Sequence, residues 1–287
     1  MMPLISIKEV AFGYEDIPIF SNVTFDLQPG ELCCLMGPNG CGKSTLLDCI
    51  LGLHKSFMGE IMIHGKEVST YKPSQLAKKI SYVPQIHDRS FPYQVIQIIL
   101  MGRSAHMGHF QTPNREDQVI ALEALQSVGI AHLAERPYTQ ISGGEMQLVM
   151  LARALVQETP MIIMDEPTAH LDYKNELVFM ETVAQLIENH GVSVLMATHS
   201  PNQAFYFENR KTKVKIALMD MGHLHQVGEP RDVLTEEAIE KIYHIESKIL
   251  TDYSEETGTL RQIVPLKSKG AHFFVKDDVD WVQRRGR

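Results

Sequence analysis

The stretch Gly37-Pro38-Asn39-Gly40-Cys41-Gly42-Lys43-Ser44 matches the pattern G-x-x-x-x-G-K-[S/T], and Thr45 follows it. It lies between the apolar run Leu32–Met36, which predicts a buried strand, and a helical pattern. Glycines let a backbone wrap a phosphate without side-chain collisions, and a helix N-terminus attracts anions. A Gly-rich turn with an accidental lysine is the alternative, but the strand–loop–helix context favours a nucleotide-phosphate loop. In such a loop Lys43 neutralises the β- and γ-phosphates and the Ser44 hydroxyl ligates Mg²⁺.

Two adjacent carboxylates, Asp165 and Glu166, follow a second apolar run at residues 161–164. In P-loop proteins an aspartate at such a strand end holds the Mg²⁺ shell. Glu166 points elsewhere and can polarise an attacking water as a general base. An isolated Asp-Glu pair is common in solvated loops. Together with the phosphate loop, the pair predicts nucleotide hydrolysis rather than transfer to another substrate.

The hydrophobic pattern predicts an α/β fold with three parts. A third apolar run at residues 192–197 also ends in a polar loop, and strands alternating with helices imply a parallel sheet with ligands at its carboxyl edge. Residues 4–30 alternate apolar and polar side chains, which is typical of an antiparallel edge sheet. Residues 92–157 read as mostly helical, with one helix beginning after Asn114 as N-cap and Asp117 near N3. We therefore expect a P-loop core, an antiparallel β subdomain and a helical subdomain.

The composition places limits on partners and location. Hydrophobic residues make up 44% and charged residues 22% of the 287 residues, and no apolar run approaches the ~18 residues of a membrane helix. Residues 1–10 include Glu9 and no long apolar core, so they do not predict a signal peptide. The formal net charge of -8 argues against a nucleic-acid partner. The four cysteines lack paired CxxC spacing, which favours a reducing compartment over zinc or disulfides.

The stretch Ile141-Ser142-Gly143-Gly144-Glu145 resembles the signature Leu-Ser-Gly-Gly-Gln of the ATP-binding-cassette (ABC) ATPases. A helical pattern follows it, and the acid pair comes about twenty residues later, as in that family. The resemblance spans about residues 4–245. The sequence departs from the signature at Ile141, which is conservative in volume, and at Glu145, which puts a carboxylate where the family often has an amide. The effect of Glu145 is left open.

Four further residues match family positions. Tyr14 resembles the aromatic that stacks on adenine, and Gln85 resembles the glutamine that touches Mg²⁺ or water and reports to the membrane subunit. Asp172 resembles the aspartate of the loop that crosses to the partner ATPase, although it could equally cap the next helix. His199 resembles the switch histidine at the γ-phosphate. The alternatives are that Tyr14 is an ordinary surface tyrosine, that Gln85 is an ordinary polar loop residue, and that His199 is a structural histidine.

The resemblance implies the cofactors ATP and Mg²⁺. The residues that it implies as catalytic are Glu166, His199, Gln85 and Lys43. The residues that it implies as nucleotide-binding are Tyr14, Gly37, Pro38, Asn39, Gly40, Cys41, Gly42, Lys43, Ser44, Thr45, Ser142, Gly143, Gly144, Glu145 and Asp172. The metal ligands that it implies are Ser44, Gln85 and Asp165.

The resemblance also implies an assembly. Two ATPase subunits form a head-to-tail homodimer in which each signature completes the partner's phosphate site, and the helical subdomain contacts integral membrane permease subunits. An extracytoplasmic substrate-binding protein completes an import system. The chain is then cytoplasmic and peripheral on the inner face of the cell membrane, with an ATPase domain at 1–243, its helical subdomain at about 92–157, and a short C-terminal extension at 244–287.

The segment 95–106, with Met101-Gly102-Arg103 and the later Asp117, resembles the subgroup that serves metal-chelate importers: iron–siderophore, haem, cobalamin and a molybdate/tungstate branch. Residues 167–172 and 228–235 agree with that subgroup. We expect the permease to contact Gln85 and residues 93–103. The alternatives are ordinary helix packing in this segment, an ABC ATPase of another transporter class, a soluble non-transport ABC ATPase, or a P-loop kinase. The transported ligand, the permease partner and the role of the tail after Ser268 remain open.

Cys41 lies inside the phosphate loop, next to a helix N-terminus, and helix N-termini lower thiol pKa values. This placement predicts a reactive thiol that Mg-ATP protects from alkylation. The alternative is a small buried residue.

Overall fold

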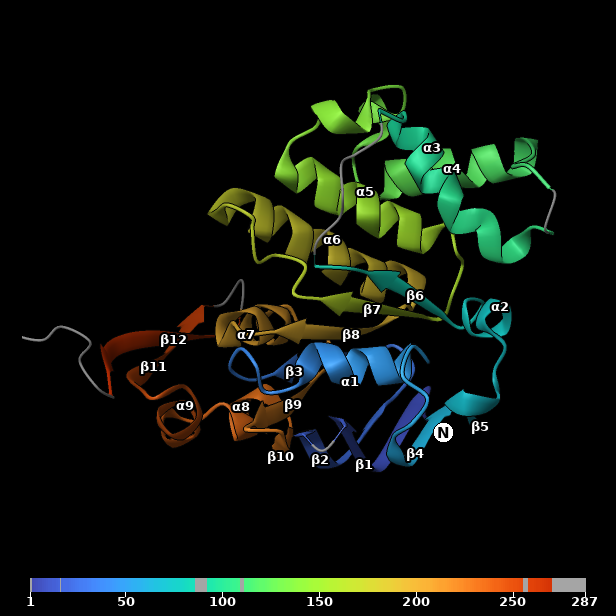
Figure 1. Cartoon of the computed structure of the whole chain (residues 1–287). Coiled ribbons are helices and arrows are strands. Elements are labelled where there is room, and N and C mark those ends of the chain that lie inside the picture. Colours follow the sequence, from blue (N-terminus) through green and yellow to red (C-terminus); the bar gives the residue numbers. More distant parts are fainter. Residues whose placement is uncertain (1, 16, 86–91, 109–110, 255–257, 270–287) are drawn as a thin grey trace, which may run out of the picture.

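The computed structural model describes residues 2–15, 17–85, 92–108, 111–254 and 258–269. Ten strands of these residues form one sheet in the order β5-β4-β1-β2-β10-β9-β3-β8-β7-β6, and two more strands form a separate hairpin. Figure 1 shows helices on both sides of the large sheet, with α1 on one face and α3 to α6 gathered near β6 and β7.

The parallel strands form the centre of the protein. They are β3 (Leu32–Met36), β8 (Ser193–Thr198), β7 (Met161–Asp165) and β6 (Ile80–Val83), and β3 also pairs in parallel with β9 (Val214–Asp220). Every residue of β3, β7 and β8 is buried, because helices or packed loops cover both faces of the sheet. The three strands expected from their apolar runs are therefore confirmed, and their carboxyl ends meet at one edge.

The antiparallel part is built from β1 (Ile5–Tyr14), β2 (Ile17–Leu27), β4 (Met58–Ile63) and β5 (Lys66–Glu67). The expectation of an antiparallel sheet within residues 4–30 is confirmed. β1 and β2 are not themselves the outer strands, however, because β4 and β5 continue the sheet beyond β1. On the other side β2 meets β10 (His223–Gly228), which pairs with β9.

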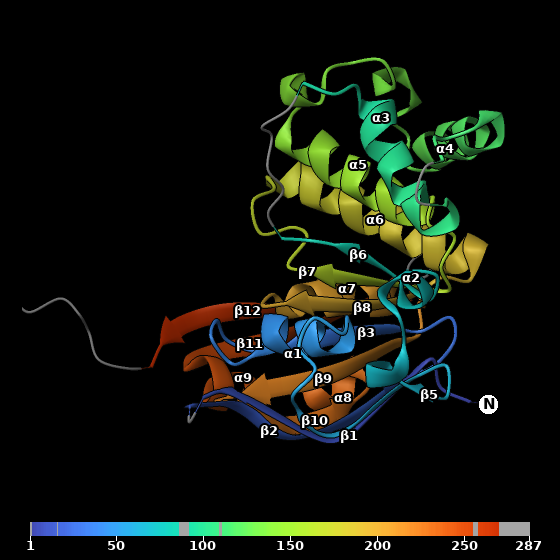
Figure 2. The same cartoon turned by 45° about the vertical axis from the view of Figure 1, so that its right-hand side comes forward.

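The helical layer follows β6 in the chain. It contains α3 (Val95–Leu100), α4 (Arg115–Ser127) and α5 (Gly143–Leu155), and Figure 2 shows these three helices stacked beyond α6 (Tyr173–His190). The Asn114 side chain accepts hydrogen bonds from the N–H groups at the start of α4, as the sequence predicted. The remaining helices are α1 (Lys43–Ile50), α2 (Pro73–Leu76), α7 (Pro201–Asn209), α8 (Pro230–Val233) and α9 (Glu236–Tyr243), with 3-10 turns at Val68–Thr70, Met101–His106, Ala131–Leu133 and Tyr138–Gln140.

Two hydrophobic clusters cover the two faces of the parallel sheet. In β3, Cys34 and Met36 belong to the cluster under the helical layer, whereas Cys33 and Leu35 belong to the cluster under α1 and the antiparallel strands. This alternation is the period-2 geometry of a strand. The four cysteines are buried and unpaired. No helix within the described ranges is long and apolar enough to cross a lipid bilayer.

The segment Met101-Gly102-Arg103 mostly serves internal packing. A Cβ atom on Gly102 would collide with the backbone of α5. Arg103 is buried, and its guanidinium donates to Asp117 Oδ1 at 2.8 Å and to Glu158 Oε2 at 2.5 Å. The buried Arg103 side chain is therefore unavailable to a permease, whereas Gly102 is half-buried and Met101 is 46% exposed. The expected permease contact at residues 93–103 stays a prediction for the rest of the segment.

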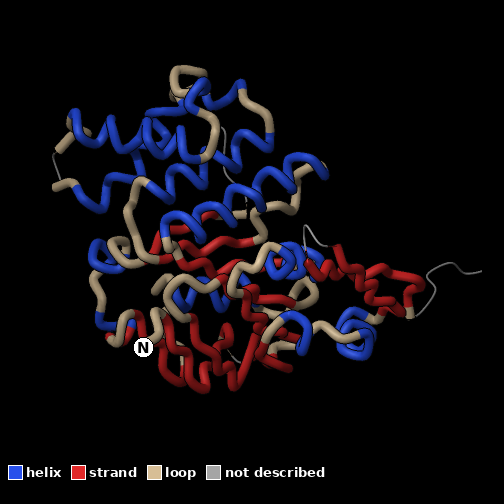
Figure 3. The backbone as a smooth tube through the Cα atoms, turned by 180° about the vertical axis from the view of Figure 1, so that it is seen from behind, coloured by secondary structure: helices blue, strands red, loops and turns tan. Residues whose placement is uncertain are grey.

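The C-terminal part contains a hairpin that the sequence analysis did not predict. Strands β11 (Ile245–Ser254) and β12 (Gly258–Ser268) pair along their length and extend beyond the main sheet in Figure 3. Asn202 and Asn209 of α7 each exchange two hydrogen bonds with the β12 backbone. Much of the hairpin is exposed, so its sequence lacks the strict apolar alternation that identifies a half-buried strand.

We predict that Arg103→Ala lowers the free energy of unfolding by about 3–5 kcal/mol, because it leaves the buried Asp117 carboxylate without its cation. Urea denaturation followed by circular dichroism measures the loss. Met101→Ala, at an exposed neighbouring position, is the control and should cost about 1 kcal/mol or less. Equal losses at the two positions would contradict this account of Arg103.

The same pair gives a pH dependence with a definite sign. The Asn114 backbone N–H, and after it the Arg103 guanidinium, hold the pKa of Asp117 below its ordinary value. A carboxyl whose pKa is lowered by folding stabilises the fold fully when the pH is above its unfolded pKa of about 3.9. That stabilisation is lost as the pH falls below this value and through the lower pKa of the folded state. The difference between wild type and Asp117→Asn should therefore shrink as urea titrations move from pH 6 to pH 3.

Candidate nucleotide site

The phosphate loop connects the end of β3 to α1 at the carboxyl edge of the parallel strands. Gly37 has φ 152°, and a Cβ there would collide with the Met219 carbonyl of β9, so the position admits no side chain. Gly42 is the N-cap of α1 with φ 101°, and no side chain caps this helix. The uncapped N–H groups of the first turn are a favourable place for an anion. Asn39, Gly40 and Ser44 are exposed, and Pro38 and Thr45 are half-buried.

The Lys43 ammonium is buried at the base of this loop. It donates hydrogen bonds to the carbonyls of Gly37 at 2.8 Å and Pro38 at 3.1 Å. Its third neighbour is the Glu166 carboxylate, with Nζ 3.4 Å from Oε1. The lysine therefore connects the phosphate loop to the loop after β7, a link that the sequence did not predict.

Glu166 lies between two of the residues expected to act with it. Its Oε2 is 3.1 Å from His199 Nδ1, while Oε1 faces Lys43. Its backbone has φ 42° and donates from its N–H to the Ala197 carbonyl at 3.0 Å. A non-glycine residue with positive φ is uncommon and tends to occur at functional sites. Half of the His199 side-chain surface is exposed, so its ring can also meet a ligand.

Asp165, the last residue of β7, fits the expected metal-ligand role. Its Oδ1 is buried and has no hydrogen-bond partner among the described residues, an arrangement that usually requires an ion or water. Burial raises the pKa of this carboxyl, while a hydrogen bond with Ser44 opposes that shift. No cluster of three or more His, Cys, Asp or Glu side chains suited to a metal occurs in the described part of the chain. Mg²⁺ bound beside nucleotide phosphates commonly keeps several waters and takes few protein ligands.

Gln85 is brought by the sheet register to the same edge of the sheet as the acid pair. It lies two residues beyond β6, whose Val83 pairs with Met164 of β7 just before the acid pair. Residues 86–91, which follow it, lie outside the described residues.

Tyr14 has an aromatic environment that the sequence did not reveal. Its hydroxyl is 3.0 Å from His54 Nε2, and the His54 ring stacks on Phe12 with centroids 4.6 Å apart. The Tyr14 ring meets Phe12 edge-on and is 49% exposed. A ring held upright in this way presents a face on which a base could stack. His54 carried no sequence signal, because its partners lie on a strand far away in the chain.

The signature forms the start of α5. Ser142 is the N-cap: its hydroxyl accepts from the Glu145 N–H at 3.3 Å, and its own N–H donates to Glu145 Oε2 at 2.7 Å. The Ser142 N–H, and then its hydroxyl, lower the pKa of Glu145. Glutamate therefore makes the capping contact that a glutamine would make, which gives the departure from the family signature a structural explanation.

Asn175 connects the signature to the loop of Asp172, and the sequence analysis missed it. Asp172 caps α6, accepting from the Asn175 N–H at 2.8 Å and from Asn175 Nδ2 at 2.9 Å. A Cβ on Gly144 would collide with the Asn175 side chain. The capping alternative for Asp172 is thus confirmed, while its role toward a partner subunit stays a prediction.

The expectation of a reactive Cys41 thiol is wrong. Its side chain is only 4% exposed and packs in the cluster under α1. Burial raises the pKa of this thiol above its ordinary value, and the nearby Lys43 charge only partly offsets that effect. Loss of water around the thiolate outweighs the field of the helix N-terminus, so the alternative of a small buried residue holds.

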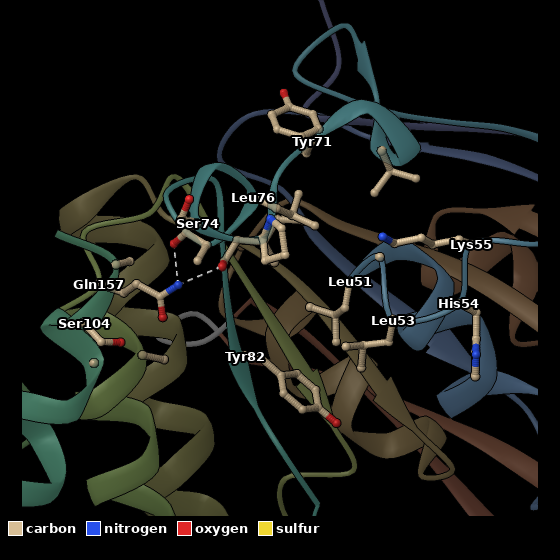
Figure 4. Close-up of a pocket in the computed structure, with 18 of the residues that line it drawn as sticks. Leu51, Leu53, His54, Lys55, Tyr71, Ser74, Leu76, Tyr82, Ser104 and Gln157 are labelled. Carbon is tan, nitrogen blue, oxygen red and sulfur yellow. Dashed lines mark hydrogen bonds between the residues drawn. The ribbon is translucent and has the colours of Figure 1, made fainter. Parts of the chain in front are cut away.

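A groove of about 610 Å³ lies beside the site, between the end of α1 and the helical layer (Figure 4). His54 lines this groove as well as contacting Tyr14. Met101, with its exposed side chain, lines the opposite wall. Other lining residues are Leu51, Leu53, Lys55, Tyr71, Leu76, Tyr82, Ser104 and Gln157.

The phosphate loop, the acid pair and the histidine after β8 together define a P-loop nucleotide-binding protein built for hydrolysis. The ABC transporter family model matches residues 20–169. The chain belongs to the ABC transporter family, as an ATP-binding subunit with ATPase activity.

Known proteins agree with this assignment. An ABC transporter ATP-binding protein of Haemophilus influenzae is 41% identical over 86% of this chain and 92% of its own length. The molybdate import ATP-binding protein MolC of the same organism is 34% identical over 85% of this chain and 90% of its own. A solved structure of a metal-chelate type ABC transporter in an inward-facing conformation superposes with a TM-score of 0.80 at 33% identity, covering 93% of this chain and 98% of that one.

We predict that the native protein at neutral pH reacts slowly with a thiol reagent such as 5,5′-dithiobis(2-nitrobenzoate), because all four cysteines are buried. In guanidinium chloride the four thiols should react at once, which the absorbance of the released thiolate measures. The prediction would be contradicted if one thiol of the native protein reacted rapidly and ATP hydrolysis was lost with it, and if the Cys41→Ser variant showed neither effect.

Proposed function

We propose that this subunit energises the import of a metal chelate or a molybdate-type oxyanion through a separate membrane permease. Two of the relatives named above support the substrate class: MolC is named for molybdate import, and the solved structure is assigned to the metal-chelate type. The observation that carries the ATPase role is the position of Glu166, held between the Lys43 ammonium of the phosphate loop and the His199 ring.

In the proposed reaction Glu166 orients and deprotonates the attacking water, and His199 positions Glu166 and contacts the γ-phosphate. Lys43 neutralises charge on the β- and γ-phosphates. Mg²⁺, where bound, would neutralise further phosphate charge, and Ser44, Asp165 and Gln85 would hold it. The orphaned Oδ1 of Asp165 supports this ligand set.

We propose that two copies associate head to tail. Ser142 is exposed, and a Cβ on Gly143 would meet no other atom within 4 Å, so the signature presents an open surface. Its N–H groups at the start of α5 suit a phosphate of the nucleotide held by a second copy. Asp172, fixed by Asn175 beside the signature, would lie at the same interface.

We propose that the groove of Figure 4 receives a cytoplasmic segment of the permease. Exposed apolar side chains, Leu53 and Met101, stand on its two walls, and Tyr82 lies on the strand that leads to Gln85. The permease would hold the chain on the inner face of the membrane, with a binding protein supplying substrate from outside. Residues 1–243 would act as the ATPase domain and 244–287 as its extension.

Glu166→Gln should reduce steady-state ATP hydrolysis by about 10²-fold or more, because the amide cannot accept a proton. ATP binding should persist, and the uncleaved nucleotide should hold two subunits together. Phosphate release and the mass in size-exclusion chromatography with Mg-ATP measure both effects. Glu60→Gln, at a half-buried position of β4 outside the site, is the matched control. Turnover close to wild type would exclude Glu166 as the base.

The substrate class is tested by reconstituting the subunit in liposomes with the permease subunits and binding protein encoded beside it. Hydrolysis and uptake should be stimulated by metal chelates or by molybdate, and should not respond to sugars or amino acids. Stimulation by a sugar or an amino acid alone would overturn the proposed class while leaving the ATPase assignment intact.

A further inference from the structure

A buried glutamine on α7 joins three segments that carry the nucleotide site. Gln203 is 4% exposed. Its Oε1 accepts a hydrogen bond from Thr198 Oγ1 at 2.7 Å, and its Nε2 donates to Thr168 Oγ1 at 2.7 Å and to Glu176 Oε1 at 2.7 Å. Both amide protons of this side chain are therefore used.

Each partner of Gln203 stands next to a residue of the site. Thr198 ends β8 immediately before His199, and its hydroxyl also accepts from the Ser200 N–H at 3.1 Å. The two chain neighbours of His199 are thus hydrogen-bonded to each other, and Thr198 is also hydrogen-bonded to Gln203.

The other two partners lie on the far side of the site. Thr168 follows Glu166 by two residues, and its carbonyl accepts from the Leu171 N–H at 3.0 Å within the turn that leads to Asp172. Glu176 is in the first turn of α6 and donates its N–H to the Asp172 carbonyl at 2.8 Å. One amide therefore ties together the loops of the base, the histidine and the α6 cap.

We propose that Gln203 is a positioning residue for ATP hydrolysis. It keeps Glu166 Oε2 and His199 Nδ1 at their distance of 3.1 Å and links both residues to the Asp172 loop. The proposal rests on the catalytic roles given above to Glu166 and His199. Small displacements of catalytic groups reduce rates strongly, and a fully satisfied buried polar network is rigid. Gln203 acts through its partners and is expected to touch neither nucleotide nor water.

Gln203→Glu tests the proposal with almost no change of volume. The carboxylate has no protons to donate, and it would face the Glu176 carboxylate across the distance that a hydrogen bond now spans. We expect kcat for ATP to fall by about tenfold or more, with KM changed by about twofold or less, because the phosphate loop is untouched.

The exchange Gln203→Glu with Glu176→Gln supplies a rescue. The amide at 176 can donate to the carboxylate at 203, and the hydroxyls of Thr168 and Thr198 can donate to it as well. We expect kcat to return to within about threefold of wild type, a coupling that a double-mutant cycle quantifies. Asn209→Ala, on the same helix, removes two hydrogen bonds to the C-terminal hairpin and should leave kcat unchanged.

Thr198→Val is the second variant, in case Gln203→Glu fails to fold, and it should also lower kcat with KM retained. An unchanged kcat in the folded single variants would overturn the proposal. The proposal would also be overturned if Asn209→Ala lowered kcat to the same extent. It would be overturned too if the double exchange restored the melting temperature but not kcat. A wild-type protein without ATPase activity would instead overturn the proposed function.

Discussion

The buried ammonium of Lys43 sets the constraint on which the site depends. A cation removed from water is tolerated only when hydrogen-bond acceptors or an anion surround it. Two carbonyls of the phosphate loop and the Glu166 carboxylate provide that surrounding, so the shape of the loop and the position of the acid pair are coupled. The parallel strands make the coupling geometrically simple, because β3, β7 and β8 end at one edge and bring Lys43, Glu166 and His199 within a few ångströms.

The parts of the fold that could be predicted are those whose local sequence already reflects burial. Strands β3, β7 and β8 are buried on both faces and therefore read as continuous apolar runs, and Asn114 begins α4 through contacts within one turn. Strands β11 and β12 are largely exposed and dock through backbone hydrogen bonds to Asn202 and Asn209, which leave little trace in the sequence of the strands. The links made by His54, Asn175 and Gln203 join residues distant in the chain, and a single sequence cannot show such pairs.

Two residues show a tertiary environment overriding a local rule. Cys41 lies at a helix N-terminus, where a thiol should ionise readily, yet desolvation dominates and raises its pKa. Arg103 lies in a segment interpreted as a contact surface, yet it is enclosed by Asp117 and Glu158 and stabilises the helical layer. In both cases sequence context identified the neighbourhood correctly. What it could not supply was the direction of the side chain, which depends on packing between elements.

The capping box of Ser142 and Glu145 has a consequence for how the signature meets a ligand or a second subunit. Its two reciprocal hydrogen bonds fix the first turn of α5 within a single chain. Ordering a flexible residue costs roughly 1–2 kcal/mol of conformational entropy. In the proposed dimer, a turn that is already ordered would avoid that penalty at the moment of contact. The signature would therefore meet a second copy as an ordered turn rather than as a loop that must fold on contact.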